Sequence, residues 1–357
     1  MRDRLTMPET GNPAYHDHNL NSSEGESSPE LSIVIVNWNS AEYVKKCLVA
    51  LDAAELPAHT QILVVDGGSF DTCASMIATE YADVEFVQAA DNIGFGRSNN
   101  LGVEQARGKM LLLLNPDTEV DEKAIKFMLD AFSTLPNPGI LGPRLLNSDG
   151  SLQTSSVAAL PTPLNQLLDS DVLRRKFPRS SLWKTYQAYN SYDSVPVEAV
   201  SGACMLLETE TFRLLGGFSP NYFMYAEDMD LCAKSLEAGY TNYHVPSSFV
   251  VHHGGGSSSQ QFSKFSEIMK RDALYMYMQL HGSFVSSFAY RAFQGISGII
   301  RMALAGPLFL LTRDVSNKSS FRKWFSITKW AFGLERWASR LRKKHTKGPE
   351  TTSVSRL

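Results

Sequence analysis

LSIVIVNWN, residues 31–39, is an unbroken run of apolar and β-branched residues that stops at two asparagines. A run of this kind is typical of a strand that is buried on both faces. Helical spacing follows at 41–51, and similar strand-like runs recur at 61–66, 84–88 and 109–114 with helical segments between them. This alternation predicts an α/β fold with a Rossmann-like, mostly parallel sheet and helices on both of its faces.

Polar residues stand where three of these strands end. They occupy Asn37 to Asn39, Asp66 to Ser69 and Asn115 to Glu119. Ligands bind such sheets outside the carboxyl ends of the strands, so we expect the three clusters to converge on one site. At Asp66 two interpretations stay open, because the carboxylate can accept hydrogen bonds from a nucleotide or form an Asx-turn before Gly67.

Composition divides the chain into four parts. Residues 1–30 are rich in Ser, Asn, Glu, Pro and Gly, which predicts a disordered leader. We expect a folded domain over 31–260, a helical region over 261–345 and a disordered tail over 346–357. The net charge of −3 argues against nucleic acid as a partner. The four cysteines form no CxxC pair, so they do not indicate a zinc site.

Apolar and basic segments lie next to each other in the last third of the chain. Residues 284–313 are strongly apolar, but Arg291 and Arg301 interrupt the run of about 20 apolar residues that a spanning helix needs. We expect this segment to lie in the membrane interface as an amphipathic helix or to fold as a helical hairpin around Gly306-Pro307. The tail over 321–347 carries nine Lys and Arg residues, one acid and three tryptophans. This pattern favours contact with an anionic membrane surface over packing of the tryptophans on the domain.

MYAEDMDLC, residues 224–232, places three carboxylates within one helical turn. The apolar residues before them, Phe223 to Tyr225, would partly shield one of Glu227, Asp228 and Asp230 from water and raise its pKa. The alternative is that acidic residues merely favour a helix N-terminus.

Two further segments carry groups that bind metals. LLLLNPDTEV, residues 111–120, delivers Asp117 just past a buried strand, where a carboxylate is suited to holding a divalent cation on a pyrophosphate. Glu119 is the weaker candidate, since it is expected to begin the next helix. His252 and His253 end a later strand, and either imidazole could be a second ligand.

An ordered set of motifs over about residues 31–260 resembles the inverting glycosyltransferases of family 2, which have the GT-A fold. The similarity is greatest to the bacterial rhamnosyltransferases that build O-antigen and cell-wall linkers. The motifs, in chain order, are SIVIVNWN, VVDGGS, DNIGFGRSNNLG, LLLLNPDTEV, SGACMLL, GGFSPNYFMYAEDMDLC and VVHHGGGSS.

The resemblance implies roles for the matching positions. One group would hold the nucleotide base and ribose: Val36, Asn37, Asn39 and Asp66. A second group would line the donor: Asn92, Gly94 and Asn99.

The resemblance also implies a metal site and a base. Asp117 corresponds to the last acid of the family's DxD metal motif, whose first position is here Asn115. Binding of Mg²⁺ or Mn²⁺ is therefore expected to depend mainly on Asp117 and His252. Asp228 matches the catalytic base that deprotonates the acceptor hydroxyl.

The function implied is metal-dependent inverting transfer of a sugar, with rhamnose from dTDP-rhamnose as the specific expectation. The acceptor would be a polyprenyl-diphosphate-linked saccharide used in cell-surface polysaccharide synthesis. We expect a cytoplasmic protein, peripheral on the inner face of the cell membrane. The alternative is a non-catalytic module on the same fold that binds nucleotide sugar or polysaccharide. The presence of Asp117, Asp228 and His252 together favours the enzyme.

Overall fold

A computed structural model describes residues 28–254, 264–312 and 315–346 of the chain. The predicted disordered tail lies almost wholly outside these residues, as does the predicted leader except for residues 28–30. The glycine run after His253 lies outside them from residue 255 onward.

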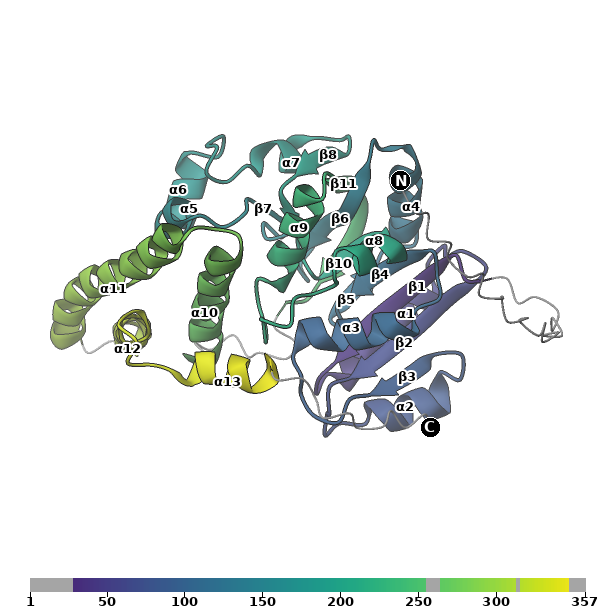
Figure 1. Ribbon diagram of the computed structural model, residues 1–357, viewed down its shortest axis with the longest axis horizontal. Coiled ribbons are helices and arrows are strands. Elements are labelled where there is room, and N and C mark those ends of the chain that lie inside the picture. Colours follow the sequence, from purple (N-terminus) through teal and green to yellow (C-terminus); the bar gives the residue numbers. More distant parts are fainter. Residues whose placement is uncertain (1–27, 255–263, 313–314, 347–357) are drawn as a thin grey trace, which may run out of the picture.

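The centre of the molecule is a nine-stranded sheet, seen in the right half of Figure 1. Its strand order is β3-β2-β1-β4-β10-β6-β11-β5, and β8 pairs with β11 at the side. A separate small ladder joins β7 to β9. The strands are β1 (Leu31–Asn37), β2 (Thr60–Asp66), β3 (Glu85–Gln88), β4 (Met110–Leu114), β5 (Thr118–Val120), β6 (Pro138–Leu146), β7 (Val157–Ala158), β8 (Val195–Val197), β9 (Ala199–Val200), β10 (Cys204–Glu208) and β11 (Thr241–His252).

The helices fall into a set around the sheet and a C-terminal set. The first set is α1 (Ala41–Asp52), α2 (Cys73–Glu80), α3 (Phe95–Gln105), α4 (Ala124–Thr134), α5 (Pro163–Leu167), α6 (Asp171–Lys176), α7 (Tyr186–Asn190), α8 (Thr209–Leu214) and α9 (Glu227–Glu237). The second set is α10 (Lys264–Leu280), α11 (Phe284–Thr312), α12 (Val315–Ala331) and α13 (Trp337–Thr346). Short helices α5 to α7 occupy the stretch between β7 and β8.

The sheet is mixed. Strands β1 to β4 are parallel, as predicted, and in register Asn37 lies beside Asp66. β10 runs antiparallel to both β4 and β6, and β5 runs antiparallel to β11. The reversal of β10 brings the residues before it to the edge where β1 and β4 end, since the Asn115 N–H donates to the Ala203 carbonyl at 2.9 Å.

Alternate residues of β1 point into two different cores. Ile33 and Ile35 pack with α1, α2 and α4, whereas Val34 and Val36 pack with α3, α8 and α9. All four side chains are buried, which is why the sequence shows a continuous apolar run and no period of two. The predicted α/β layering, with helices on both faces of the sheet, is confirmed.

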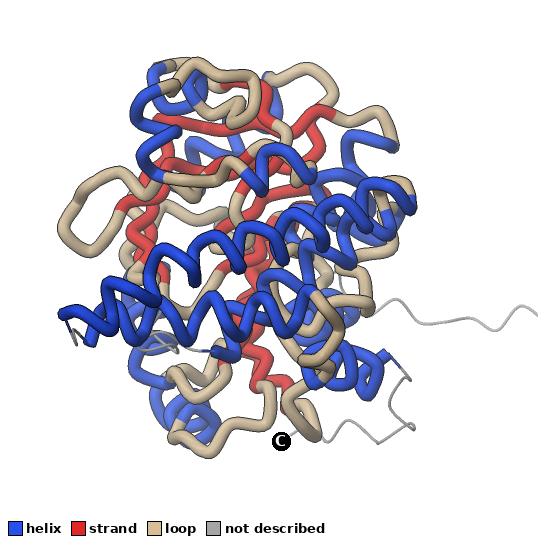
Figure 2. Tube along the Cα trace, turned by 90° about the vertical axis from the view of Figure 1, so that its left-hand side faces the viewer, coloured by secondary structure: helices blue, strands red, loops and turns tan. Residues whose placement is uncertain are grey.

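Helices α10 to α13 form a third layer beside the sheet (Figure 1), and in the turned view α11 and α12 cross in front of it (Figure 2). Their core includes Tyr222, Phe223 and Ala226, which immediately precede α9. The C-terminal helices therefore support the loop that leads into the acidic motif. No helix among the described residues is long and apolar enough to cross a membrane.

α11 runs through Gly306-Pro307 without a break, so the hairpin expected there is wrong. It packs instead along α12, and Gly298 allows the close approach, because an added Cβ would collide with the Thr328 hydroxyl. The glycine thus leaves room for the Thr328 side chain where the two helices meet.

The three tryptophans of the C-terminal segment pack inward. Trp330 is buried and donates to the Asp272 carboxylate at 3.3 Å. Trp324 lies under the guanidinium of Arg301, 4.3 Å from its ring centre. Trp337 stacks on Phe265 with ring centres 5.3 Å apart. These contacts agree with the packing interpretation of the tryptophans, two of which are only partly buried, and membrane contact by this segment stays a prediction.

Candidate active site

A cavity of about 1100 Å³ opens where β1 and β4 end. Its walls come from the sheet edge, from the start of α9, from the segment over 155–183 and from α10. Eight of the eleven predicted site residues line it: Val36, Asn37, Asn92, Gly94, Asn115, Asp117, Asp228 and His252. The other three, Asn39, Asp66 and Asn99, are not part of its lining.

Asp66 is used within the protein. One of its carboxylate oxygens accepts from the Asn37 side-chain amide at 2.9 Å, and the other accepts from the Ser69 N–H at 2.7 Å. The second bond closes the turn at Gly67, as the turn interpretation of Asp66 predicts, and its role toward a nucleotide stays a prediction. The Asn37 side chain is thereby fixed at the cavity wall. Asn39 points elsewhere, since its side-chain oxygen accepts from the Phe70 N–H at 2.8 Å.

Gly94 brings two loops together at the cavity. Its φ of +87° is in the left-handed region, and an added Cβ would collide with the Phe223 carbonyl oxygen. The Asn92 side chain accepts from the Gly94 N–H at 3.0 Å and fixes this turn. Asn99 is buried in α3 and donates to the Phe95 carbonyl at 3.1 Å, so the structure does not bring it to the cavity.

Asp117 and His252 meet across the antiparallel strands β5 and β11. The His252 Nε2 lies 3.3 Å from the Asp117 Oδ1, and both side chains are largely buried. The next residue, His253, is not part of the cavity lining and pairs with Glu119 at 2.7 Å. Glu119 lies within β5 and does not begin a helix, which corrects that expectation.

Asn115 adds a third oxygen near this pair. Its side-chain oxygen is buried and has no hydrogen-bond partner among the described residues. A buried polar oxygen without a partner is costly unless a ligand satisfies it. Carboxylate, imidazole and amide groups are all donors that divalent cations accept, so these residues fit a metal ion. No group of three or more His, Cys, Asp or Glu side chains in the described parts of the chain has the arrangement of a complete metal site.

The start of α9 presents Asp228 to the cavity. Tyr225 and Ala226 both have positive φ, which turns the chain sharply into the helix. The two Asp228 oxygens accept from the Gly202 N–H at 2.9 Å and the Met229 N–H at 2.8 Å. Withdrawal from bulk water raises the pKa of this carboxyl in spite of these bonds. The direction is the one predicted for one of the three acids of this motif.

The other two acids of the motif have different surroundings. Burial, and then the negative charge of Asp228, raise the pKa of Glu227 to about 8. Asp230 is fully buried on the far side of the turn and pairs with Lys234 and His281, each at 2.8 Å. These partners lower its pKa against the effect of burial. Asp230 therefore ties α9 to the end of α10 and has a structural role.

The wall opposite the sheet carries groups that the sequence did not identify as site residues. Lys270 projects from α10 over the Tyr225 ring, 5.1 Å from its centre, and Leu274 lies one turn further on. Arg174 lies over the Trp183 ring at 4.9 Å and pairs with Asp169. No spacing in the sequence links these segments to the strand ends, so only the fold reveals them.

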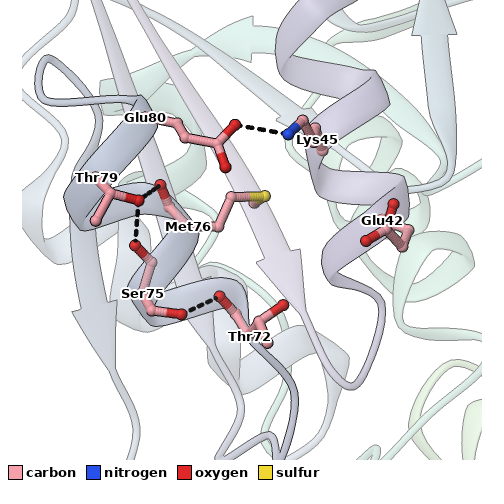
Figure 3. Close-up of a pocket in the computed structure, with 7 residues that line it drawn as sticks. All are labelled: Glu42, Lys45, Thr72, Ser75, Met76, Thr79 and Glu80. Atoms are coloured by element: carbon pink, nitrogen blue, oxygen red, sulfur yellow. Dashed lines mark hydrogen bonds and ion pairs between the residues drawn. The ribbon is translucent and has the colours of Figure 1, made fainter.

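A second, smaller hollow of about 200 Å³ lies between α1 and α2 (Figure 3). The ion pair between Lys45 and Glu80, at 2.6 Å, spans it, and both side chains are nearly half exposed. The hydroxyls of Ser75 and Thr79 bond to carbonyls of their own helix. This hollow is ordinary packing between two surface helices.

Comparison with known proteins now gives the family. Residues 32–194 match the family model described as glycosyl transferase family 2. The chain is 30% identical over 244 residues to the N-acetylglucosaminyl-diphospho-decaprenol L-rhamnosyltransferase of Mycobacterium tuberculosis, covering 64% of this chain and 78% of that protein. It is 28% identical over 250 residues to the rhamnosyltransferase WbbL of Escherichia coli, covering 65% and 86%.

The fold is also that of a solved transferase. The mannosyltransferase PcManGT from Pyrobaculum calidifontis, solved in complex with GDP-Man and Mn²⁺, superposes with a TM-score of 0.52 at 13% identity. The alignment covers 87% of this chain and 88% of that one. At this identity the likeness shows the fold alone, and it confirms the predicted GT-A architecture. The sequence relatives are named transferases, which decides for the enzyme over the non-catalytic module. The chain belongs to glycosyl transferase family 2 and is a glycosyltransferase.

Proposed function

We propose that this protein is a metal-dependent inverting transferase that moves a sugar from a nucleotide diphosphate to a hydroxyl of a lipid-linked saccharide. The observation that carries the proposal is the content of one cavity. It holds the Asp117–His252 pair and, from a different element, the raised-pKa carboxylate of Asp228. A metal-binding pair and a base in one cavity are the two functions that such a transfer needs.

Asp117 and His252 would hold Mg²⁺ or Mn²⁺, with Asn115 beside them. Such cations are often bound by one or two protein ligands together with substrate phosphates, so a two-residue site is sufficient. When bound, the metal neutralises the charge that develops on the departing nucleotide diphosphate.

Asp228 would act as the base. Its raised pKa makes it a better proton acceptor than an exposed aspartate, and the Gly202 and Met229 N–H groups fix its direction. The acceptor oxygen gives its proton to Asp228 and forms the new bond to the anomeric carbon. The bond from that carbon to the diphosphate oxygen breaks on the opposite side, and its electron pair leaves with the diphosphate. Attack opposite the leaving group inverts the anomeric centre, and no covalent enzyme intermediate is required.

The acceptor would occupy the wall formed by α10 and the segment over 155–183. A cavity of about 1100 Å³ is at the upper end of the range for single small-ligand sites, which leaves room for two substrates. Lys270 and Arg174 supply positive charge there for a diphosphate, and Leu274 and Trp183 supply apolar contact. The Mycobacterium tuberculosis relative is named for a diphospho-decaprenol acceptor, which supports the lipid-linked class.

The names of both sequence relatives support rhamnose as the sugar, and we take the product to be a cell-surface polysaccharide. We take dTDP-rhamnose as the donor to be tested first. The protein would work as a peripheral protein on the inner face of the cell membrane, where such a lipid-linked acceptor is available.

The face of α11 that turns away from the rest of the protein supports membrane contact. Arg291 folds inward and donates to the Ala331 and Trp330 carbonyls at 2.8 and 2.9 Å. The outer face is left with a stripe of side chains that are about half or more exposed: Phe284, Val285, Phe288, Ile296, Ile299, Ile300 and Leu304. A helix with such a face is suited to lying in the lipid interface.

The proposal is tested with purified protein, dTDP-rhamnose, Mn²⁺ and a polyprenyl-diphosphate-linked N-acetylglucosamine. We expect Asp228→Asn to lower kcat at least 100-fold with donor binding nearly unchanged, because the variant keeps the shape and loses the base. Asp117→Asn should weaken Mn²⁺-dependent donor binding. Glu119→Gln and His253→Asn, two positions from Asp117 and one position from His252, are the matched controls and should retain activity. Near-normal turnover by Asp228→Asn would refute the assignment of the base.

A further inference from the structure

We propose that Gln153 is a positioning residue that fixes the tautomer of His252. It would place the ring proton on Nδ1 and leave the Nε2 lone pair facing Asp117. The inference rests on the proposed function only in treating His252 Nε2 as a cation ligand. The evidence is a chain of hydrogen bonds in the hairpin that follows β6, each of which has only one possible direction.

The chain begins at the carboxylate of Asp149, which can only accept when ionised. The Ser151 hydroxyl lies 2.6 Å from it and therefore donates. With its proton used, the Ser151 oxygen accepts from the Asn147 side-chain NH₂ group at 2.9 Å. The same NH₂ group faces the Leu152 carbonyl at 3.5 Å, which is also an acceptor. The Asn147 side-chain oxygen must therefore face the other way.

The Asn147 oxygen accepts from the NH₂ group of Gln153 at 3.1 Å. That NH₂ group also donates to the His252 carbonyl at 3.2 Å. Two acceptors on the nitrogen side determine the orientation of the Gln153 amide, so its oxygen faces His252 Nδ1 at 2.8 Å. An amide oxygen only accepts, and so Nδ1 carries the proton.

A neutral imidazole that is protonated on Nδ1 has a bare lone pair on Nε2. This lone pair lies 3.3 Å from an oxygen of Asp117. Two electron-rich atoms at this distance repel each other unless a cation lies between them. Histidines that bind metals typically donate their other N–H to an oxygen in this way, which orients the ring and fixes its tautomer.

The adjacent histidine provides an internal comparison. His253 Nε2 lies 2.7 Å from the Glu119 carboxylate, which requires a proton on Nε2. Its Nδ1 lies 2.8 Å from the Ser148 hydroxyl, which can donate to it. The two neighbouring imidazoles thus carry their protons on different ring nitrogens. Of the two, only His252, which lines the cavity, has an Nε2 without a proton.

The direct test is a long-range ¹H–¹⁵N NMR spectrum of the metal-free protein at pH 8.5, labelled at histidine. Signals are assigned by their loss in His252→Asn and His253→Asn. We expect the Nδ1–H pattern for His252 and a protonated Nε2 for His253. A protonated Nε2 on His252 would overturn the proposal. Because this readout needs neither metal nor substrate, it does not depend on whether the proposed transfer is correct.

Variants of Gln153 test its role. Gln153→Leu removes the acceptor, so we expect the Nδ1–H pattern of His252 to be lost and the affinity for Mn²⁺ alone, measured by electron paramagnetic resonance, to fall about tenfold or more. Gln153→Glu keeps an acceptor for the Nδ1 proton and should preserve the pattern. Ser148→Ala, which removes the partner of His253, is the matched control and should leave both His252 and Mn²⁺ binding unchanged. An unaltered His252 spectrum in Gln153→Leu would refute the role of Gln153, and the remaining histidine signals show whether that variant is folded.

Discussion

At the scale of single residues, Glu227 should control how the cavity responds to pH. Its pKa of about 8, raised by burial and by the charge of Asp228, keeps it protonated at pH 7. As the pH rises through 8 it ionises and adds a second negative charge beside Asp228, which opposes entry of a diphosphate. We expect the KM for the donor to rise several-fold between pH 7 and pH 9. In Glu227→Gln, which imitates the protonated form, the KM should stay flat.

The control for this measurement is Glu119→Gln, which alters a carboxylate outside the cavity and should leave the rise in KM unchanged. An equal rise in Glu227→Gln would show that another group is responsible. At low pH, protonation of Asp228 should limit kcat, because this carboxylate must be ionised to act as a base. Because burial raises its pKa, kcat should begin to fall at a higher pH than for an exposed aspartate.

Single residues also show what could be learned from the sequence about the site. Asp117 and His252 were predicted together because a family resemblance linked two motifs far apart in the chain. Gln153 was not predicted, since its chemistry comes from a hairpin that contacts His252 only in the folded protein. For Asp66 the sequence left two roles open, because a strand-end aspartate has the same pattern whether it binds a nucleotide or closes a turn, and the structure shows the turn bond.

At the scale of elements, the start of α1 depends on a residue from a different loop. Ser40 occupies the N-cap position, but its side chain makes no cap bond. The Asp71 carboxylate takes that role, accepting from the Ala41 N–H at 2.8 Å and from the Cys73 N–H of α2 at 3.2 Å. One side chain thus joins the starts of two helices.

We expect Asp71→Ala to lower the free energy of unfolding by about 1–2 kcal/mol, the usual effect of losing a cap. The measurement is urea unfolding followed by circular dichroism. Thr72→Ala is the control, because Thr72 is exposed and makes no side-chain cap bond. It should change the free energy of unfolding by less than about 0.5 kcal/mol. Equal effects of the two substitutions would show that Asp71 is not the effective cap.

The order of elements was predictable to different degrees along the chain. β1, β2 and β4 were identified because strands buried on both faces need continuous apolar runs, and their parallel pairing follows from the helices between them. The direction of β10 was not predictable, because an apolar strand has the same sequence pattern in either direction. The segment that connects β6 to β10 is long enough to allow both directions, and only the pairing of β10 with β4 and β6 decides between them.

At the scale of the whole molecule, the C-terminal helices connect the candidate active site to a large apolar surface. Their inner side packs around Tyr222, Phe223 and Ala226, just before the acidic motif. Their outer side carries the stripe of α11. A pattern of arginines, lysines and tryptophans could not show which side chains face inward. The structure packs the tryptophans against other side chains of the protein and leaves the apolar stripe of α11 exposed.

If this stripe lies in the lipid interface, charges placed on it should release the protein from membranes. We expect the triple variant Phe288→Glu, Ile296→Glu and Ile300→Glu to lower binding to anionic lipid vesicles at least tenfold in a flotation assay. Burial of each such side chain contributes about 1.5–3 kcal/mol, so the loss of three is large. Leu214→Glu is the control, because this residue is 72% exposed but lies on α8. Transfer to a water-soluble acceptor should be unchanged in the triple variant, since none of its three positions lines the cavity. Unchanged flotation would show that the stripe does not bind lipid.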